Sequence, residues 1–438
     1  MVTEAAEAVT IDATEERRHL IRVVTASAIG TTIEWYDFFL YGIAAALVFP
    51  QKFFPASEPF VATLLSFSTF FVGFLARPVG AALFGHYGDR IGRKSLLIAT
   101  LMLMGVATTG MGLVPSYETI GIWGAVLLTV GRVLQGIAVG GEWSGSVLMA
   151  GEWTDPKLRG FTTSFAQVGA PAGMALANGV LILVSLLLDD EAFLSWGWRV
   201  PFLMSVVLVL IGFYIRRGIR ESPVFSRMQD EGRVAKTPLL DVIRHNSREI
   251  ALTALLRTGQ QVPFYIFTTY ILAYASQTLG MPRTTILAFV MIQCILSLFT
   301  IPYAGYLSDR YGRRLITAIG CVMMAIYPFI YFQMLDTRVP WVVFLAVLLA
   351  APAHDLQYGP QAAFIAESFP GSRRYSGSAL GYQLASITAG GPAPLIATIL
   401  FERFQTSMAI AAYISISALI SLACVAALAH RAGSLDHE

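Results

Sequence analysis

Long apolar runs alternate with short polar segments along nearly the whole chain. A transmembrane helix needs about 20 consecutive, mostly apolar residues. In hydrocarbon a segment must satisfy its own backbone hydrogen bonds, so a helix is expected in each run unless the chain forms a closed barrel. The pattern therefore predicts an all-α integral membrane protein with twelve transmembrane helices. The predicted spans cover residues 22–48, 60–84, 95–114, 121–150, 161–188, 198–216, 250–276, 284–306, 315–334, 340–366, 376–400 and 407–429.

The amino-acid composition agrees with residence in a membrane. Hydrophobic residues make up 55% of the 438 residues and charged residues only 13%, whereas a soluble domain carries about 25% charged residues. The formal net charge of +2 argues against a nucleic-acid partner. Cys294, Cys321 and Cys424 lie in apolar stretches and lack the spacing of a disulfide framework or a zinc site.

Lysine and arginine are distributed unevenly between the two sets of predicted loops. With the N-terminus in the cytoplasm, the cytoplasmic loops and tails hold 22 of the 30 basic residues and the outer loops hold four. This distribution satisfies the positive-inside rule. We therefore expect a multi-pass protein of the cell (plasma) membrane with both termini in the cytoplasm. Residues 1–21 and 430–438 form cytoplasmic tails in this interpretation, and the acidic start of the chain is not a signal peptide.

One long polar stretch, residues 216–249, divides the spans into six and six. The sequence therefore predicts an N-terminal six-helix bundle over 22–215, a cytoplasmic linker over 216–249 and a C-terminal six-helix bundle over 250–429. The linker charges either form a solvated amphipathic connector or bind anionic lipid or a regulator.

A ten-residue motif occurs twice, 220 residues apart, each time in the short loop after the second span of its half. Both copies, GHYGDRIGRK and GYLSDRYGRR, follow the pattern GxxxDRxGR[KR]. A glutamate and an arginine seven residues later form a second repeated pair at matching loops. The residues involved are Gly85, Asp89, Arg90, Gly92, Arg93, Lys94, Gly305, Asp309, Arg310, Gly312, Arg313 and Arg314, with Glu152, Arg159, Glu367 and Arg374.

The two repeats predict an internal duplication and a conformational latch. Glycine permits a tight turn and a close helix approach, while aspartate caps a helix N-terminus or pairs with arginine. Such a charge network between two bundles locks one conformation and breaks in another. The alternative is a structural brace that also serves as an orientation signal.

These motifs carry a resemblance to a known family. The repeated loop motif resembles the signature of the major facilitator superfamily. EWYDFFLYG (34–42), ARPVG (76–80), GGEW (140–143), WGWRVPF (196–202) and ESPVF (221–225) together resemble its metabolite:proton symporter family. The resemblance implies two six-helix bundles and the transport of shikimate, citrate, 2-oxoglutarate, dicarboxylates, or proline and betaine. AHD (353–355), RYSG (374–377) and GYQ (381–383) favour the shikimate-like members, and the missing C-terminal coiled coil disfavours proline and betaine.

Charged residues inside spans are costly and usually functional. Glu34, Asp37 and Tyr41 share one face of the first span, because they are three and four residues apart. Asp37, and secondarily Glu34, are candidates for the proton-coupling group, the alternative being a fixed hydrogen bond between helices. In the fourth span, Arg132 with Gln135 suits carboxylate recognition, or else Arg132 pairs with Asp37 or Glu34.

Further candidates lie in other spans. Arg77 either contacts substrate or reaches toward the cytoplasmic surface. In the second half, Arg257 with Gln260 and Gln261 forms one polar cluster, and His354, Asp355, Gln357 and Tyr358 form another. Adjacent helical residues point about 100° apart, so His354 and Asp355 are not expected to face one cavity together. The predicted substrate-binding residues are Arg132, Arg257, Arg77, Tyr41, Gln135, Gln261, Tyr358, Tyr382 and Gln383.

Phosphate-cradling loops, HExxH and GxSxG are missing from the sequence. We therefore predict that the chain is not an enzyme and needs no metal or cofactor. The predicted function is import of a small organic acid by proton symport, in a monomer embedded in the lipid bilayer. The alternatives are a uniporter, an antiporter, a proline or betaine carrier, and a membrane sensor that transports nothing.

Overall fold

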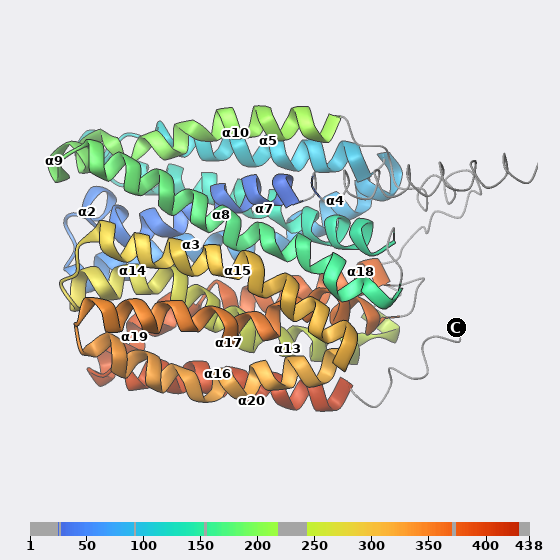
Figure 1. Ribbon diagram of the computed structural model, residues 1–438. Coiled ribbons are helices and arrows are strands. Elements are labelled where there is room, and N and C mark those ends of the chain that lie inside the picture. The colour runs from blue at the N-terminus through green and yellow to red at the C-terminus, as the bar shows by residue number, and fades with distance from the viewer. Residues whose placement is uncertain are drawn as a thin grey trace, which may run out of the picture.

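The computed structural model describes residues 25, 28–91, 93–152, 156–217, 243–369 and 374–428. Side-chain placement is described for all of them except 85–94, 141–146, 148–156, 216 and 374–376. Every regular element in these ranges is helical, and they contain no strand. The helices lie side by side as a bundle, with α4 and α18 at one end and α2 and α9 at the other (Figure 1). The predicted all-α fold is therefore confirmed.

Helix is present in each of the twelve predicted spans of the described chain. The first span contains a helix over residues 28–47. The helices that follow are α2 (Phe49–Phe53), α3 (Pro59–Leu75), α4 (Arg77–Ile91), α5 (Arg93–Gly112), α6 (Tyr117–Ile120), α7 (Trp123–Glu152), α8 (Arg159–Leu187), α9 (Asp190–Ala192), α10 (Arg199–Arg217), α13 (Ser247–Tyr265), α14 (Ile271–Ala273), α15 (Arg283–Tyr311), α16 (Arg313–Asp336), α17 (Pro340–Glu367), α18 (Arg374–Ala385), α19 (Ala393–Phe404) and α20 (Met408–Leu428).

Within the described ranges, nine helices are long and apolar enough to cross a membrane. The number is ten if the bent pair Asp190–Gly197 and Arg199–Ile215 forms one span. The other two predicted spans contain the helix over 28–47 and the continuous helical stretch 247–278. Both of these stretches carry buried polar residues.

Two spans change from α-helix to π-helix partway along their length. In the seventh, α13 continues as η3 (Ile266–Tyr270), α14 and η4 (Tyr274–Thr278); in the eleventh, α18 continues as η6 (Ser386–Gly390) before α19. Single π-helical turns inside α-helices occur frequently at functional sites. The first π-helix begins at Ile266, five residues after Gln261, and the other begins at Ser386, three residues after Gln383.

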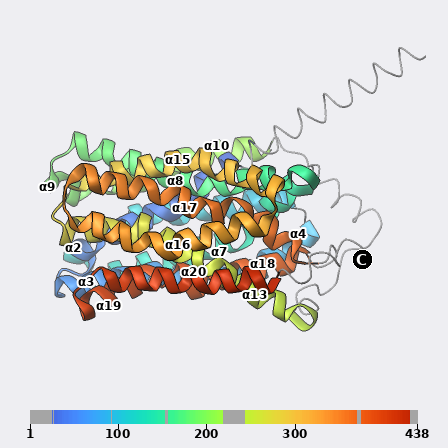
Figure 2. The same cartoon turned by 60° about the horizontal axis from the view of Figure 1, so that its bottom comes forward.

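Helices from before and after the 216–249 segment pack directly on each other. The most extensive helix contact joins α8 to α15, and α18 also packs on α4 and α7. Figures 1 and 2 both show α8 and α15 side by side. A Cβ added to Gly305 would lie only 2.6 Å from the main-chain oxygen of Gly160, so the two backbones approach as closely as glycine allows.

The predicted domain boundaries stay predictions. Residues 218–242 of the expected linker lie outside the described part of the chain, as do the expected tails, 1–21 and 430–438.

Candidate functional site

Three arginine side chains are enclosed by the bundle. They are Arg77 on α4, Arg132 on α7 and Arg257 on α13, each at most 1% exposed. Arg77 interacts electrostatically with both of the other guanidinium groups. A buried charge in a membrane protein costs a few kcal/mol or more and needs a partner or a purpose. The structure thus brings together three residues that the sequence singled out separately.

Most hydrogen-bond donors of Arg132 are engaged by the protein itself. Its Nη1 donates to the main-chain oxygen of Phe38 over 3.1 Å and to Oε1 of Gln135 over 2.8 Å. Its Nε donates to the main-chain oxygen of Phe70 over 3.3 Å. Arg132 therefore holds the helix over 28–47 and α3 against α7.

Arg77 has a different environment. None of its three side-chain nitrogens has a hydrogen-bond partner of normal geometry among the described residues. Its guanidinium carbon lies 4.4 Å from the ring centre of Phe38 and 4.3 Å from that of Phe74. Full burial excludes a side chain that reaches the membrane surface. These N–H donors lie between aromatic rings, interact with the Tyr265 side chain and suit a ligand carboxylate.

Arg257 contacts the eleventh span where the π-helix begins. Its Nη1 donates to the main-chain oxygen of Tyr382 over 2.6 Å and to Oγ of Ser386 over 3.0 Å. Its guanidinium also stacks on the Tyr382 ring. Gln261, one turn along α13, is buried and its Oε1 has no hydrogen-bond partner in the described chain.

Asp37 is completely buried in the helix over 28–47. One carboxylate oxygen accepts a hydrogen bond from the hydroxyl of Ser205 on α10. The described residues form no ion pair between Asp37 and Arg132. Instead Gln135 connects them, because its Nε2 donates to the main-chain oxygen of Asp37 over 3.2 Å while its Oε1 accepts from Arg132. Glu34 is also buried and has partners of its own.

The remaining substrate candidates are buried and several join distant helices. The Tyr41 hydroxyl donates to Thr69 over 2.8 Å. Gln383 on α18 donates to the main-chain oxygen of Gly140 on α7 over 3.2 Å. Tyr358 and Tyr382 interact electrostatically with Arg77. These contacts place Tyr358, Tyr382 and Gln383 at the interface between the two halves of the chain.

Tyr265 is a central residue that the sequence did not single out. It is buried and interacts with Arg77 and Arg257. Its ring packs against Phe70 and Phe74 of α3, with ring centres 5.9 and 5.2 Å apart. The available signal was its spacing, since Tyr265 follows Gln261 by four residues on one face of α13. An aromatic wall from both halves therefore surrounds the arginines.

A second polar group lies in the C-terminal half. His354 Nδ1 is 2.8 Å from Oδ1 of Asp355, and His354 Nε2 is 2.9 Å from Nε2 of Gln260. The hydroxyl of Thr300 donates to the other oxygen of Asp355. The sequence noted His354 and Asp355 but expected them to face apart. Their side chains meet because the histidine ring reaches back to its neighbour's carboxylate.

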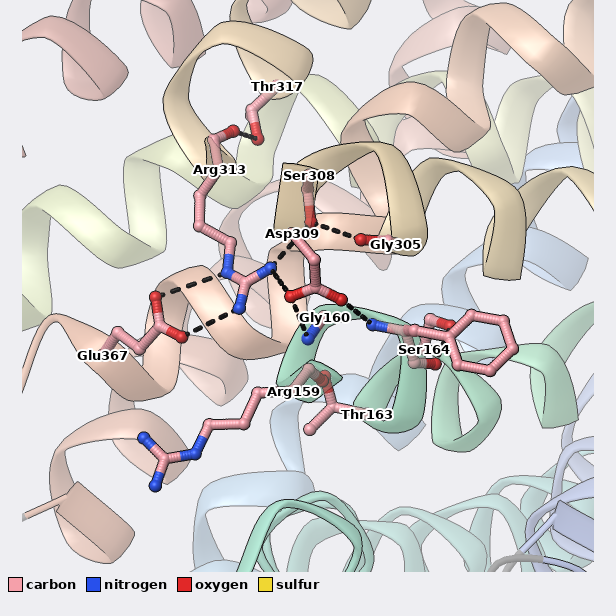
Figure 3. Close-up of polar contacts among 11 residues, drawn as sticks. Arg159, Gly160, Thr163, Ser164, Gly305, Ser308, Asp309, Arg313, Thr317 and Glu367 are labelled. Atoms are coloured by element: carbon pink, nitrogen blue, oxygen red, sulfur yellow. Dashed lines mark hydrogen bonds and ion pairs between the residues drawn. The ribbon is translucent and has the colours of Figure 1, made fainter. Parts of the chain in front are cut away.

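The second copy of the repeated motif forms a charge cluster at the end of the bundle where α15 meets α16, here called the basic end. Figure 3 shows Asp309 between the start of α8 and Arg313. Its carboxylate accepts from the main-chain N–H groups of Gly160 and Phe161 over 2.9 and 2.8 Å. Asp309 thus caps the N-terminus of α8, where the helix dipole favours an anion.

Arg313 extends this cluster to α17. It binds Asp309 over 2.5 Å and Glu367 over 3.1 Å. Arg159 lies beside the cluster without a marked interaction in Figure 3. Arg310 is exposed and lies over the Tyr311 ring, while Arg314 has a partner of its own. Gly312 has a φ of +93°, which favours glycine at the junction of α15 and α16.

The first copy of the motif is not described at the level of side chains. Gly85, Asp89 and Arg90 lie in α4, and Arg93 and Lys94 begin α5, but Gly92 and all of these side chains lie outside the described residues. The same holds for the side chains of Glu152 and Arg374. Their role in a latch stays a prediction.

Contacts also join the two halves at the end opposite the basic end. Arg283, the first residue of α15, binds Asp190 of α9 over 2.8 Å. Gln277 donates to Thr63 over 3.4 Å. Contacts between the two halves are thus present at both ends of the bundle.

A cavity of about 390 Å³ lies elsewhere, at the basic end among α13, α16, α17 and α20. Its lining shares Arg313 and Glu367 with the charge cluster around Asp309 and contains none of the three buried arginines. The cavity is therefore separate from the candidate site.

Comparison with known proteins identifies the family. The profile of the Major Facilitator Superfamily matches residues 27–393 and 267–435. The chain belongs to the major facilitator superfamily. A shikimate transporter of Escherichia coli is 41% identical over 405 residues, which cover 91% of this chain and 92% of that protein. The inner membrane metabolite transport protein YhjE of Escherichia coli is 41% identical and covers 87% of this chain and 88% of its own.

Other members of the superfamily are similar at greater distance. The proline/betaine transporter of Escherichia coli is 33% identical, with 92% of this chain and 82% of that protein covered. The solved structure of the proton:xylose symporter XylE aligns with a TM-score of 0.75 at 17% identity, covering 95% of this chain and 96% of its own. These findings confirm the major facilitator fold. The protein is a multi-pass membrane transporter of metabolites, not an enzyme.

Proposed function

We propose that this transporter imports a small organic acid together with protons. The observation that carries the proposal is Arg77, a fully buried guanidinium that interacts with the Tyr265 side chain and otherwise has no geometric hydrogen-bond partner in the described chain. A substrate carboxylate would supply paired acceptors to its planar donor fork. The rings of Phe38, Phe74 and Tyr265 around it suit a compact cyclic or unsaturated acid. The similarity to a shikimate transporter supports this substrate class.

In this proposal Arg257 supplies the second contact to the acid from the C-terminal half. Arg77 and Arg257 belong to α4 and α13, on either side of the 216–249 segment, and they interact electrostatically. A bound anion would reduce their mutual repulsion and hold both halves to one ligand. Carriers of this kind generally bind substrate near the middle of the membrane, between their repeats.

Asp37 is the proposed proton-coupling residue. It is completely buried: one carboxylate oxygen accepts a hydrogen bond from Ser205, and Oδ2 has no geometric hydrogen-bond partner in the described chain. Protonation would remove a charge from this enclosed position. Because Gln135 connects Asp37 to Arg132, a change at Asp37 would reach the helices that Arg132 holds together. Proton uptake would thereby be linked to rearrangement of the N-terminal half.

The proposed cycle moves two six-helix bundles, 22–215 and 250–429, against each other. The basic end faces the cytoplasm, as the positive-inside rule requires. Closure at that end uses the Asp309 cap on α8. Release of this cap would open the site to the cytoplasm and let proton and acid leave together.

Uptake by purified protein in liposomes tests the proposal. A pH gradient is imposed with the vesicle interior alkaline. Labelled shikimate, a dicarboxylate, an aromatic acid and betaine are then added outside in separate samples. We expect accumulation of at least one acid above its external concentration, abolished by a protonophore. If the labelled solute only reaches the same concentration on both sides, the protein is a uniporter. If solute entry is coupled to proton efflux from the vesicles, the protein is an antiporter. Uptake of betaine alone would favour the proline/betaine relatives, and no uptake of any solute would contradict transport of this class.

A further inference from the structure

The His354–Asp355 pair is not used in the cycle above, although it lies close to the proposed site. His354 is 5% and Asp355 1% exposed. The His354 ring lies 5.3 Å from Phe264 and 5.4 Å from Tyr358, measured between ring centres. Phe264 in turn packs on Phe39 of the N-terminal half. The pair is therefore one side chain away from the interface between the halves.

We propose that His354 and Asp355 form a second proton-binding site, whose protonation turns the amide of Gln260 toward substrate binding. This inference rests on the proposed proton symport and extends it to the C-terminal half. The ligand of the site is a proton, and the acceptor atom is Nε2 of His354.

The hydrogen bonds around His354 fit the neutral imidazole. Its Nδ1–H donates to Asp355, so Nε2 is the acceptor in the contact with the Gln260 amide nitrogen. Gln260 Oε1 is buried and has no hydrogen-bond partner in the described chain. In this state the carboxylate of Asp355 leaves the pair with a net negative charge. One added proton would neutralise this buried charge.

Proton uptake by His354 changes which atom of the Gln260 amide can hydrogen-bond to it. The proton adds to Nε2, the imidazole becomes an imidazolium, and the carboxylate of Asp355 stays ionised. Nε2 is then a donor and repels the amide NH2 group. A half-turn of the amide lets Oε1 accept from Nε2 and moves the NH2 donors to the place where Oε1 had no partner. Deprotonation at Nε2 reverses the turn.

The position of Gln260 connects this turn to the substrate. Gln260 follows Arg257 by three residues on α13, so the two side chains share one face of the helix. Two additional N–H donors on that face would strengthen binding of an acid anion. Proton and anion would then favour each other's binding, as symport requires.

The surroundings of the pair hold few other groups that titrate. From α15, Cys294 and Thr300 face Asp355. Tyr358 packs on His354. It interacts with Arg257 and Tyr265 of α13 and with Tyr382 of α18. From α8, Gln167 donates to the main chain of Tyr358. Asp355 is the carboxylate that the described contacts bring to His354.

Nuclear magnetic resonance of the ¹⁵N-histidine-labelled full chain in lipid nanodiscs tests the proposal directly. The sequence has six histidines, and the signal that H354Q removes belongs to His354. We expect this signal to convert from neutral imidazole to imidazolium as the pH is lowered from 8 to 5, and D355N to alter the conversion because it removes the partner carboxylate. If H354Q does not fold, replacement of the other five histidines assigns the signal instead.

Acid exchange across liposomes at equal pH on both sides supplies the second readout. We expect wild-type exchange to rise as pH falls, H354Q to lose most of this dependence, and H245Q, at an exposed histidine, to retain it. Q260L should keep the titration of His354 but lose its effect on exchange. A His354 that stays neutral down to pH 5, or an unchanged H354Q profile, overturns the proposal. Absence of any transport by the wild type would refute the proposed function instead. The NMR titration of His354 does not depend on transport and still tests the proton-binding site.

Discussion

At the scale of single residues, the buried arginines divide into two kinds. Arg132 satisfies backbone oxygens of Phe38 and Phe70, so it acts mainly as a structural tie. Arg77 has no such partners of normal geometry in the described chain and is the better candidate for substrate recognition.

The division predicts opposite phenotypes for two matched variants. R77Q should weaken acid binding roughly tenfold or more, about 1.4 kcal/mol, and leave the melting temperature nearly unchanged. R132Q should lower the melting temperature, because it removes buried hydrogen bonds from a charged group, each worth about 1.5–3 kcal/mol. Thermal unfolding in detergent and acid binding by calorimetry check both. The reverse pattern, with R77Q unstable and R132Q stable but unable to bind, would contradict the assignment.

The sequence identified which charges are buried but not their partners. The cost of an ion in hydrocarbon makes Asp37, Arg132 and Arg257 stand out in any apolar run. Their hydrogen bonds depend on which helices become neighbours, and this is not a local property of the chain. The Asp37–Arg132 pair considered from the sequence is replaced by a connection through Gln135. Tyr265 was overlooked because aromatic residues are common throughout such a chain.

At the scale of elements, closure of the basic end depends on the contact between α8 and α15. A Cβ on Gly160 would lie 2.7 Å from Oγ of Ser308 and 2.8 Å from the main-chain oxygen of Gly305, and would also collide with Arg313. Any side chain at this position prevents the two helices from meeting as they do here.

We therefore predict that G160V favours the state that is open at the basic end. Overpacking costs about 1–3 kcal/mol in the closed state, so acid transport should fall while the protein stays folded. Labelling of a cysteine introduced at Tyr382, in the otherwise cysteine-free chain, measures access to the site from that end and should increase. G110V is the control, because nothing lies within 4 Å of a Cβ at Gly110. Equal labelling of G160V and G110V would argue against this closure.

The helices themselves were predictable to within several residues, since apolar length and short polar loops determine them. The α15 span, expected over 284–306, extends from Arg283 to Tyr311. The π-helical segments η3, η4 and η6 were not predicted. Their hydrogen-bond shift leaves the apolar pattern unchanged and arises from packing, so sequence periodicity does not reveal it.

At the scale of the whole molecule, helices from before and after the 216–249 segment meet around enclosed charges. The second copy of the repeated motif engages the opposite half through α8, as a latch between the halves requires. The repeated loop motif could be found from the sequence because it is long and specific, and the duplication that it predicts stays a prediction. The contacts between the halves could not be predicted from the sequence, because they join segments about 150 residues apart, such as Asp309 and Gly160.

The central claim is that a proton taken up at Asp37 drives accumulation of the acid. The most direct measurement compares wild type and D37N in the same liposomes, once under an imposed pH gradient and once in exchange of labelled for unlabelled acid without a gradient. We predict that D37N loses uphill accumulation, because its amide cannot take up and release a proton, but keeps exchange. Undiminished uphill accumulation by D37N would contradict the account.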